Sequence, residues 1–306
     1  MPVKDISVVI PTYNCGRFLG EAIASVLDQT HPVDEILVVD DGSSDNTRDV
    51  AAGFGDRVRY LYQENRGPAA ARNHGIREAK SEWIAILDAD DFWKPEKIDL
   101  QVREVARDPK AVLIYTSFCQ FFPDGTERII TATDPNRLWP RLRYENCVSG
   151  GSNVLVRRDV LVAENGFDET VRGVEDWDCW ARLAKRYRFA AVSTPVTMVR
   201  IRPESLSYNH FKLAGETRKI LDKTLVSDLH GLRRAVWRRR IWSSVLFHCA
   251  VSAQGHDSNE ERKFLMESLL EWPSPTFLPK RWAALSRSLL GAKNWANLRR
   301  LSHRHR

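Results

Sequence analysis

The chain turns from apolar to acidic within one short segment, Trp83-Ile84-Ala85-Ile86-Leu87-Asp88-Ala89-Asp90-Asp91. Its apolar residues follow one another without interruption, which is typical of a strand buried on both faces of a parallel sheet. Alternate side chains of an extended segment point the same way, so Asp88 and Asp90 should face one site. The segment therefore predicts a buried strand with an acidic site at its carboxyl end.

Similar strands precede this one, and helical patterns separate them. Strands are expected at residues 6–11, 36–39 and 58–62, and helices at about 18–29, 43–52 and 69–79. Such alternation with short connections predicts an α/β fold with a mostly parallel sheet and right-handed crossovers. Farther on the pattern is less regular, with strands expected at 111–118, 153–157, 189–193 and 196–201 and a helix at 177–185.

Polar turns follow three of the predicted strands: Thr12-Tyr13-Asn14, Asp40-Asp41 and Asp88 to Asp91. Ligands of open α/β sheets bind beyond the carboxyl ends of the strands, so these turns should converge on one site. Mg²⁺ commonly takes one or two carboxylates together with substrate phosphates. The pair Asp88 and Asp90 therefore suits a metal–diphosphate complex.

Each acidic segment also has a purely structural interpretation. Asp91 before Lys94-Pro95 would make a good start for a helix from Lys94, and Asp40-Asp41-Gly42-Ser43 is a favourable turn. Glu175-Asp176 would stabilise the start of the helix at 177–185 through its dipole. This structural role would not exclude a functional one for Glu175-Asp176, because a capped helix start holds its side chains in fixed positions.

Five ordered segments carry a family resemblance: Val9-Ile10-Pro11-Thr12-Tyr13-Asn14, Val38-Val39-Asp40-Asp41-Gly42-Ser43-Ser44-Asp45, Gly67-Pro68-Ala69-Ala70-Ala71-Arg72-Asn73, Leu87-Asp88-Ala89-Asp90-Asp91 and Glu175-Asp176-Trp177-Asp178. Together they closely resemble the family 2 glycosyltransferases over roughly the first two-thirds of the chain. The resemblance implies the GT-A fold, a Rossmann-like mixed and mostly parallel sheet. It also implies inverting transfer of a sugar from a nucleotide donor.

On the donor side, the resemblance implies a role for each matching residue. The nucleotide pocket would be lined by Pro11, Thr12 and Tyr13, with Asp41 on the base, Asp40 beside it and Arg72 near the diphosphate. The triplet Asp88-Ala89-Asp90 would bind the metal. In it Asp90 would be the direct ligand, with Asp88 or Asp91 reaching the ribose or the metal shell.

On the acceptor side, the resemblance makes Asp176 the general base, with Glu175 and Trp177 beside it. A hydroxyl becomes a good nucleophile only as its proton is taken, so a carboxylate must lie within hydrogen-bond reach. Gly151 and Ser152 are candidates for a donor-sugar or acceptor loop, although a turn before a strand explains them equally. Arg202 stands where the family often has a histidine near the diphosphate, and there it could supply a fixed positive charge.

Composition describes a soluble globular protein. The chain has 306 residues, 43% hydrophobic and 28% charged, and no apolar run of about 18 residues that could span a membrane. The start shows no signal-peptide pattern, and the five cysteines are scattered without metal or redox spacing. A cytoplasmic location is therefore expected, with free thiols. The net charge of +6 favours anionic partners.

The sequence predicts a catalytic domain over residues 1–208, divided into a nucleotide-binding half (1–110) and an acceptor-side half (111–208). Residues 209–306 are expected to form a basic helical extension. Its segment of arginines and tryptophans, residues 233–242, suits packing on the catalytic domain, contact with an anionic membrane or, as the weakest of the three, nucleic acid. Lipid-linked acceptors are common in the family, so the resemblance is compatible with a peripheral contact at the inner face of the membrane.

The functional hypothesis is an inverting, Mn²⁺- or Mg²⁺-dependent transfer from a UDP- or dTDP-sugar, with a UDP-sugar preferred. The acceptor would be a hydroxyl of a glycan or a lipid-linked molecule, in the synthesis of cell-surface polysaccharide or lipopolysaccharide. The alternative is a non-catalytic module that binds nucleotide sugars or a membrane surface. Residues 12–17 lack the glycine-rich, lysine-bearing loop of a nucleotidyltransferase, and no G-x-G-x-x-G follows a strand as in a dehydrogenase.

Overall fold

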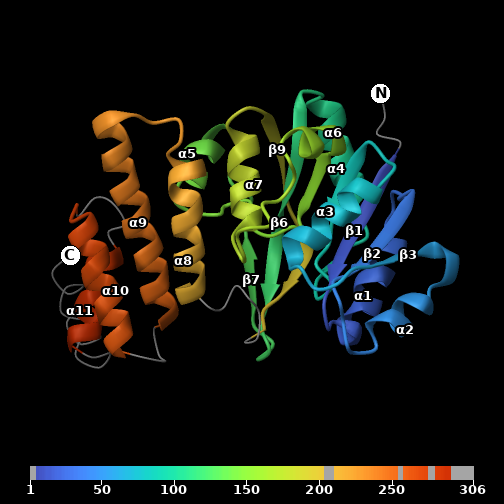
Figure 1. Ribbon diagram of the computed structural model, residues 1–306, viewed down its shortest axis with the longest axis horizontal. Coiled ribbons are helices and arrows are strands. Elements are labelled where there is room, and N and C mark those ends of the chain that lie inside the picture. The colour runs from blue at the N-terminus through green and yellow to red at the C-terminus, as the bar shows by residue number, and fades with distance from the viewer. Residues whose placement is uncertain (1–4, 203–209, 254–257, 275–279, 291–306) are drawn as a thin grey trace, which may run out of the picture. The chain divides into compact units, whose positions relative to one another are not determined.

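A computed structural model describes residues 5–202, 210–253, 258–274 and 280–290 (Figure 1). The chain divides into two compact units. The first contains Met1–Leu142 and Asn146–Ser205, and the second contains Arg143–Glu145 and Leu206–Arg306. The predicted boundary after residue 208 stays a prediction, as does the division of the first domain at residue 110.

The first unit is built on one mixed sheet with the strand order β3-β2-β1-β4-β8-β6-β9-β5. Its first four strands are parallel to one another and match the predicted ones: β1 (Ile6–Thr12), β2 (Glu35–Asp40), β3 (Arg59–Tyr62) and β4 (Trp83–Ile86). The others are β5 (Phe92–Trp93), β6 (Ala111–Phe121), β7 (Glu127–Ile130), β8 (Val154–Arg157) and β9 (Arg188–Arg200). The antiparallel strand β8 lies between β4 and β6, which makes the sheet mixed, as expected.

Two details of the second half differ from the sequence predictions. The strands expected at residues 189–193 and 196–201 form the single strand β9, because its pairing with β6 continues past an irregularity opposite Pro195. The helix expected from Lys94 begins at Lys97, because Phe92 and Trp93 pair with β9 as strand β5. Both differences come from pairing between segments that are far apart in the chain.

Helices flank this sheet (Figure 1). They are α1 (Gly16–Leu27), α2 (Thr47–Ala52), α3 (Pro68–Glu78), α4 (Lys97–Arg107), α5 (Leu138–Leu142), α6 (Arg158–Ala163) and α7 (Glu175–Ala184). Helical spacing predicts one apolar face from Leu19, Ile23, Val26 and Leu27; the first three are buried in α1, whereas Leu27, the last residue of the helix, is exposed. A Cβ atom at Gly75 would lie 2.3 Å from Val9 Cγ1, so glycine is what allows α3 to approach β1 so closely. This packing fixes the start of α3, which carries Arg72.

The described part of the second unit is helical. Its elements are α8 (His210–Ile220), a π-helical turn (Leu221–Leu225), α9 (Gly231–Ala253), α10 (Ser258–Glu271) and α11 (Lys280–Leu290). The guanidinium of Arg281 is buried and donates to Ser243 Oγ at 2.5 Å and to the Ser268 carbonyl at 2.9 Å, which ties three of these helices together. Across the described ranges, every helix is too short or too polar to cross a membrane.

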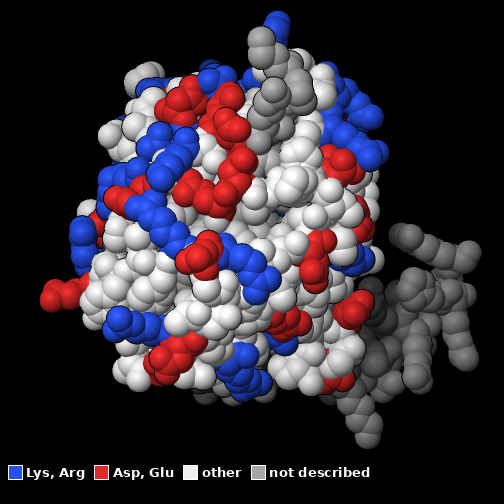
Figure 2. Space-filling model, turned by 90° about the vertical axis from the view of Figure 1, so that its right-hand side faces the viewer, with Lys and Arg blue, Asp and Glu red and all other residues white. Residues whose placement is uncertain are grey.

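Charge is distributed unevenly along the chain. Residues 209–306 contain 19 Lys and Arg against 8 Asp and Glu, whereas acidic residues are in excess before them. Figure 2 shows the face that carries α2 and β3, where acidic and basic side chains are intermixed. The excess positive charge of the whole protein therefore belongs to its C-terminal third.

Candidate active site

Two aspartates beyond β4 are each paired with an arginine. Asp88 Oδ1 accepts a hydrogen bond from Arg72 Nη2 at 2.8 Å, and Asp90 Oδ2 accepts one from Arg202 Nη2 at 2.5 Å. Burial and the nearby charge of Asp88 raise the pKa of Asp90, while the charge of Arg202 opposes that shift. The predicted metal-binding pair is thus an acidic centre whose charge the protein itself partly neutralises.

The donor atoms of this centre fit a divalent cation that shares its coordination with a substrate. Asp88 Oδ2 accepts no hydrogen bond from the part of the chain that the structure describes. The loop at Gly150 lies beside this oxygen, since a Cβ atom there would be 3.6 Å from it. Within the same part, no cluster of three or more His, Cys, Asp or Glu residues could hold a metal unaided. Asp88 and Asp90 would therefore hold the ion together with phosphate oxygens and water, as Mg²⁺ sites commonly do.

Asp91 points into the protein. Its Oδ2 accepts from Ser152 Oγ at 2.6 Å and its Oδ1 accepts from the backbone N–H of Arg200 at 2.9 Å. Burial and the charges of Asp90 and Asp88 raise its pKa well above the usual range. Asp91 thus braces the end of β4 against β9, and the predicted reach of Asp88 to a ribose or the metal shell stays a prediction.

Gly151 and Ser152 support the same region. Ser152 is buried, and besides donating to Asp91 its hydroxyl accepts from the backbone N–H of Asp88 at 3.1 Å. A Cβ at Gly151 would lie 2.7 Å from Ile86 Cγ2, so this loop packs against β4 only because the residue is glycine. The geometry agrees with a supporting loop, and the predicted contact of these residues with a sugar stays a prediction.

The carboxylates after β2 are occupied by protein donors. Asp41 accepts from Gln63 Nε2 at 2.7 Å and from the backbone N–H groups of Arg66 at 2.9 Å and Gly67 at 2.7 Å. Asp40 accepts from the Ser43 backbone at 2.8 Å and from the Tyr60 hydroxyl at 2.6 Å. These contacts match the structural interpretation of the turn. The predicted contact of Asp41 with a base is not tested by them.

The residues after β1 lie beside this turn. Pro11 and Thr12 are buried, and Thr12 Oγ1 has no hydrogen-bond partner within the described ranges. Tyr13 is half exposed, with 51% of its surface accessible. The backbone N–H of Asp41 donates to the Thr12 carbonyl at 2.9 Å, so the turns after β1 and β2 are joined. The structure therefore joins the turns after β1 and β2, in which Pro11, Thr12, Tyr13, Asp40 and Asp41 lie.

Arg72 connects the donor side to the acceptor side. Its guanidinium is buried and donates to Asp88 through Nη2 and to Glu175 Oε1 through Nη1, both at 2.8 Å. Glu175 is also buried and accepts from the backbone N–H of Gly173. A buried guanidinium between two carboxylates is well compensated electrostatically. The predicted contact of Arg72 with a diphosphate stays a prediction.

Asp176 lies in the first turn of α7, which begins two residues earlier than predicted. Its carboxylate accepts from Asn146 Nδ2 at 2.9 Å and from the backbone N–H of Trp177 at 2.7 Å. Burial, reinforced by the charge of Glu175, raises the pKa of Asp176 to about 6, while Arg72 opposes the shift. A carboxylate with such a pKa is well suited to accept a proton near neutral pH.

Other contacts at this site could not be recognised from the sequence. Asn146 lies in a loop without a motif, and its contact with Asp176 depends on how that loop folds. Arg200 donates through Nε to the Asp90 carbonyl at 3.1 Å. Its position two residues before the predicted Arg202 was the only feature of the sequence that could have indicated this contact. Trp177 is buried, and its indole N–H donates to the Leu142 carbonyl at 2.6 Å, which gives it a packing role.

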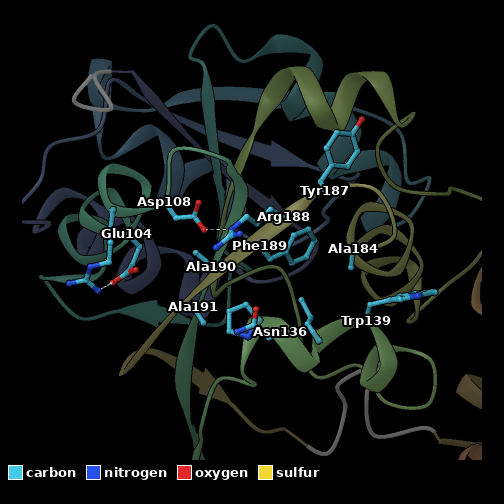
Figure 3. Close-up of a pocket in the computed structure, with 13 residues that line it drawn as sticks. Glu104, Asp108, Asn136, Trp139, Ala184, Tyr187, Arg188, Phe189, Ala190 and Ala191 are labelled. Carbon is cyan, nitrogen blue, oxygen red and sulfur yellow. Dashed lines mark hydrogen bonds and ion pairs between the residues drawn. The ribbon is translucent and has the colours of Figure 1, made fainter.

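A cavity of about 450 Å³ lies elsewhere in the first unit (Figure 3). It is lined by the end of α4, the start of β9 and residues 135–139, and the ion pair between Asp108 and Arg188 lies within it. Because β6 and β9 run parallel to β4, the start of β9 is at the opposite edge of the sheet from the acidic centre. None of the predicted site residues lines this cavity.

Comparison with known proteins agrees with the geometry. The model of the family described as Glycosyl transferase family 2 matches residues 7–162. The putative teichuronic acid biosynthesis glycosyltransferase TuaG of Bacillus subtilis is 30% identical over 221 residues, which are 69% of this chain and 85% of TuaG. An uncharacterized glycosyltransferase of Rickettsia conorii is 34% identical over 64% of this chain, which spans only 33% of that relative.

Solved structures show the same fold. S. aureus TarS 1–349 in complex with UDP-GlcNAc superposes with a TM-score of 0.62 at 16% identity, covering 96% of this chain and 89% of TarS 1–349. The mannosyltransferase PcManGT of Pyrobaculum calidifontis, in complex with GDP-Man and Mn²⁺, gives 0.54 at 19% identity, covering 94% and 86%. The mixed α/β sheet is therefore a GT-A sheet, as the sequence predicted.

Proposed function

The chain belongs to glycosyl transferase family 2, and on that premise we propose that it is a metal-dependent, inverting glycosyltransferase with Asp176 as its general base. One observation carries the proposal. Arg72 links Asp88, at the predicted metal and diphosphate side, to Glu175, the neighbour of Asp176. A donor-side carboxylate and a base of raised pKa are thus held in one connected site.

Asp176 would act on the acceptor. Its carboxylate is held by Asn146 and by the start of α7, and it takes the proton of the acceptor hydroxyl as that oxygen attacks the anomeric carbon. The diphosphate leaves from the opposite face, so the anomeric centre is inverted and no covalent sugar–enzyme intermediate forms. Asn146 keeps the carboxylate oriented during the proton transfer.

Asp88 and Asp90 would hold the donor through a divalent cation. When bound, Mn²⁺ or Mg²⁺ neutralises charge on the leaving diphosphate. Arg72 keeps Asp88 in place, and Asp91 with Ser152 keeps the acidic segment attached to β9. These contacts preorganise the carboxylates, so that little rearrangement is needed when the donor binds.

The donor that we propose is a UDP-sugar or a dTDP-sugar, with a UDP-sugar preferred. Solved structures of the same fold contain UDP-GlcNAc or GDP-Man with Mn²⁺, which supports a nucleoside diphosphate sugar with a metal ion. The relative TuaG is named for teichuronic acid biosynthesis. We therefore place the acceptor among glycans and lipid-linked molecules of cell-surface polysaccharide or lipopolysaccharide synthesis.

The pH dependence of the reaction tests the proposed base. Asp176 must be ionised to take a proton, and its pKa is raised to about 6. With Mn²⁺ and an accepted UDP-sugar, the rate of UDP release is therefore expected to rise with pH through about 6 and to level off above it. Thermal unfolding at each pH is the control for loss of folded protein. A donor screen that yields no UDP release with any nucleotide sugar would favour the non-catalytic alternative.

We also propose that the second unit contacts the inner face of the membrane. In favour of this, residues 209–306 are rich in Lys and Arg, and Leu232 and Trp282 expose 80% and 44% of their surface. Against it, Arg238 is paired with Asp222 and Arg239 with Glu271, so part of the positive charge is used internally. The protein should sediment with vesicles that contain anionic lipid and stay in solution with neutral ones. Equal sedimentation with both would exclude an electrostatic contact.

A further inference from the structure

Arg202 forms an ion pair with Asp90, the proposed direct ligand of the metal. Its Nη2 lies 2.5 Å from Asp90 Oδ2, and the two side chains are only 27% and 18% exposed. A hydrogen-bonded ion pair that is shielded from solvent in this way is stronger than an exposed surface pair. Arg202 Nε is buried without a hydrogen-bond partner among the described residues. The guanidinium is held by Asp90, by a contact with the Cys15 side chain and by the Phe18 ring 5.1 Å away.

The position of the Arg202 guanidinium beside Asp90 depends on how the end of β9 is held. Arg202 comes two residues after β9, and the end of β9 is fixed by Arg200. The backbone N–H of Arg200 donates to Asp91, and its side chain donates to the Asp90 carbonyl at 3.1 Å and to Glu21 at 2.7 Å. The pairing of Arg202 with Asp90 is therefore built on a well-anchored strand end.

A divalent cation and Arg202 would compete for Asp90. The guanidinium hydrogen-bonds the carboxylate that the cation needs as a ligand, and the two positive charges repel each other at such short range. A nucleoside diphosphate changes the balance in two ways. Its phosphate oxygens complete the coordination of the metal, and they offer the guanidinium a new bidentate partner.

From this geometry, and resting on the proposed function, we propose that Arg202 is an internal counterion that closes the metal site until a nucleoside diphosphate arrives. Arg202 pairs with Asp90 in the donor-free protein and with the diphosphate in the loaded one. The metal and the nucleotide then bind interdependently. Because binding free energies are linked, each raises the affinity for the other by the same factor.

The test is a titration of the full-length protein with MnCl₂, with free Mn²⁺ measured by electron paramagnetic resonance, in the absence and presence of UDP. For the wild type we expect UDP to tighten Mn²⁺ binding at least about tenfold, within the usual range of such couplings. Arg202→Gln should bind Mn²⁺ alone about tenfold more tightly than the wild type, and UDP should add correspondingly less. Such a gain in affinity is not expected from a merely structural defect.

Three further variants are the controls for the tighter Mn²⁺ binding expected of Arg202→Gln. Arg202→Lys keeps the positive charge and should stay within about twofold of the wild type. Arg17→Gln removes an exposed guanidinium that stacks on the same Phe18 ring at 4.7 Å without pairing with Asp90, and it should leave Mn²⁺ affinity unchanged. Asp90→Asn should lose Mn²⁺ binding with and without UDP, which identifies the ligand.

Two outcomes would overturn the proposal. One is Arg202→Gln binding Mn²⁺ alone no more tightly than the wild type. The other needs no variant at position 202: wild-type protein that binds Mn²⁺ equally tightly with and without UDP. Wild-type protein that binds neither Mn²⁺ nor UDP would instead contradict the proposed function, so the two failures can be distinguished.

Discussion

Replacing Asp176 with asparagine is expected to lower the rate of sugar transfer by roughly 10²- to 10⁴-fold, the usual contribution of a general base. The amide has nearly the size of the carboxylate but cannot take the proton of the acceptor hydroxyl. Binding of UDP and Mn²⁺ should stay unchanged, because the donor-side carboxylates Asp88 and Asp90 are untouched. The measurement is single-turnover transfer, with UDP affinity determined separately.

Asp159→Asn is the matched control for that variant. Asp159 also lies in the first turn of a helix, α6, and accepts from the backbone N–H of the next residue, Val160, at 2.8 Å. The same chemical change there should alter transfer by less than about twofold, since only a group within hydrogen-bond reach of the reacting proton can act as the base. If Asp176→Asn also keeps near wild-type transfer, the base is a different residue.

The second large effect is expected at the metal site. In the wild-type protein, UDP with Mn²⁺ should raise the melting temperature more than UDP alone, because a ligand at 100 times its Kd adds about 2.7 kcal/mol to the free energy of unfolding. Asp90→Ala should abolish the part that depends on Mn²⁺ and should abolish transfer, because it removes the proposed direct ligand. Differential scanning fluorimetry across a series of Mn²⁺ concentrations measures this.

Asp49→Ala serves as the control, because Asp49 is an exposed acidic residue of α2. It should retain the full Mn²⁺-dependent increase in melting temperature. If Asp90→Ala retains it as well, the metal is not held by Asp90, and both the proposed site and the role of Arg202 lose their basis. If Mn²⁺ stabilises the wild type equally without UDP, the proposed role of Arg202 is excluded, while Asp90 can still be the metal ligand.

Asp88 and Asp90, the two aspartates of the proposed metal site, are each paired with a different arginine. Arg72, from α3, is buried and donates through its two Nη atoms to Asp88 and Glu175, so it connects two carboxylates inside the protein. Arg202 has Asp90 as its one ion-pair partner among the residues described, and its side chain is more exposed than that of Arg72. For this reason we assign the exchange of partners on diphosphate binding to Arg202, while the predicted contact of Arg72 with the diphosphate stays a prediction.

The local pattern of the sequence was sufficient for the nucleotide-binding half of the fold. Continuous apolar runs predicted β1, β2 and β4, because a strand buried on both faces excludes polar side chains. The edge strand β3 is only partly buried and contains Arg59, and the structure confirms it as well as the other three within about two residues. The second half was predicted less well, since its strands β5 and β9 are defined by pairing between distant segments. Such pairing leaves little trace in the local pattern.

What the sequence determined by itself about this protein is which acidic residues follow which strands, and hence that Asp88, Asp90 and the turns after β1 and β2 share one edge of the sheet. The tertiary structure alone decided which carboxylate oxygens are already engaged. The donors to Asp91 and Asp90 lie 61 and more than 100 residues away in the chain. Hydrogen bonds act over about 3 Å, so the partners of a carboxylate depend on how distant segments pack and not on the spacing of residues around it.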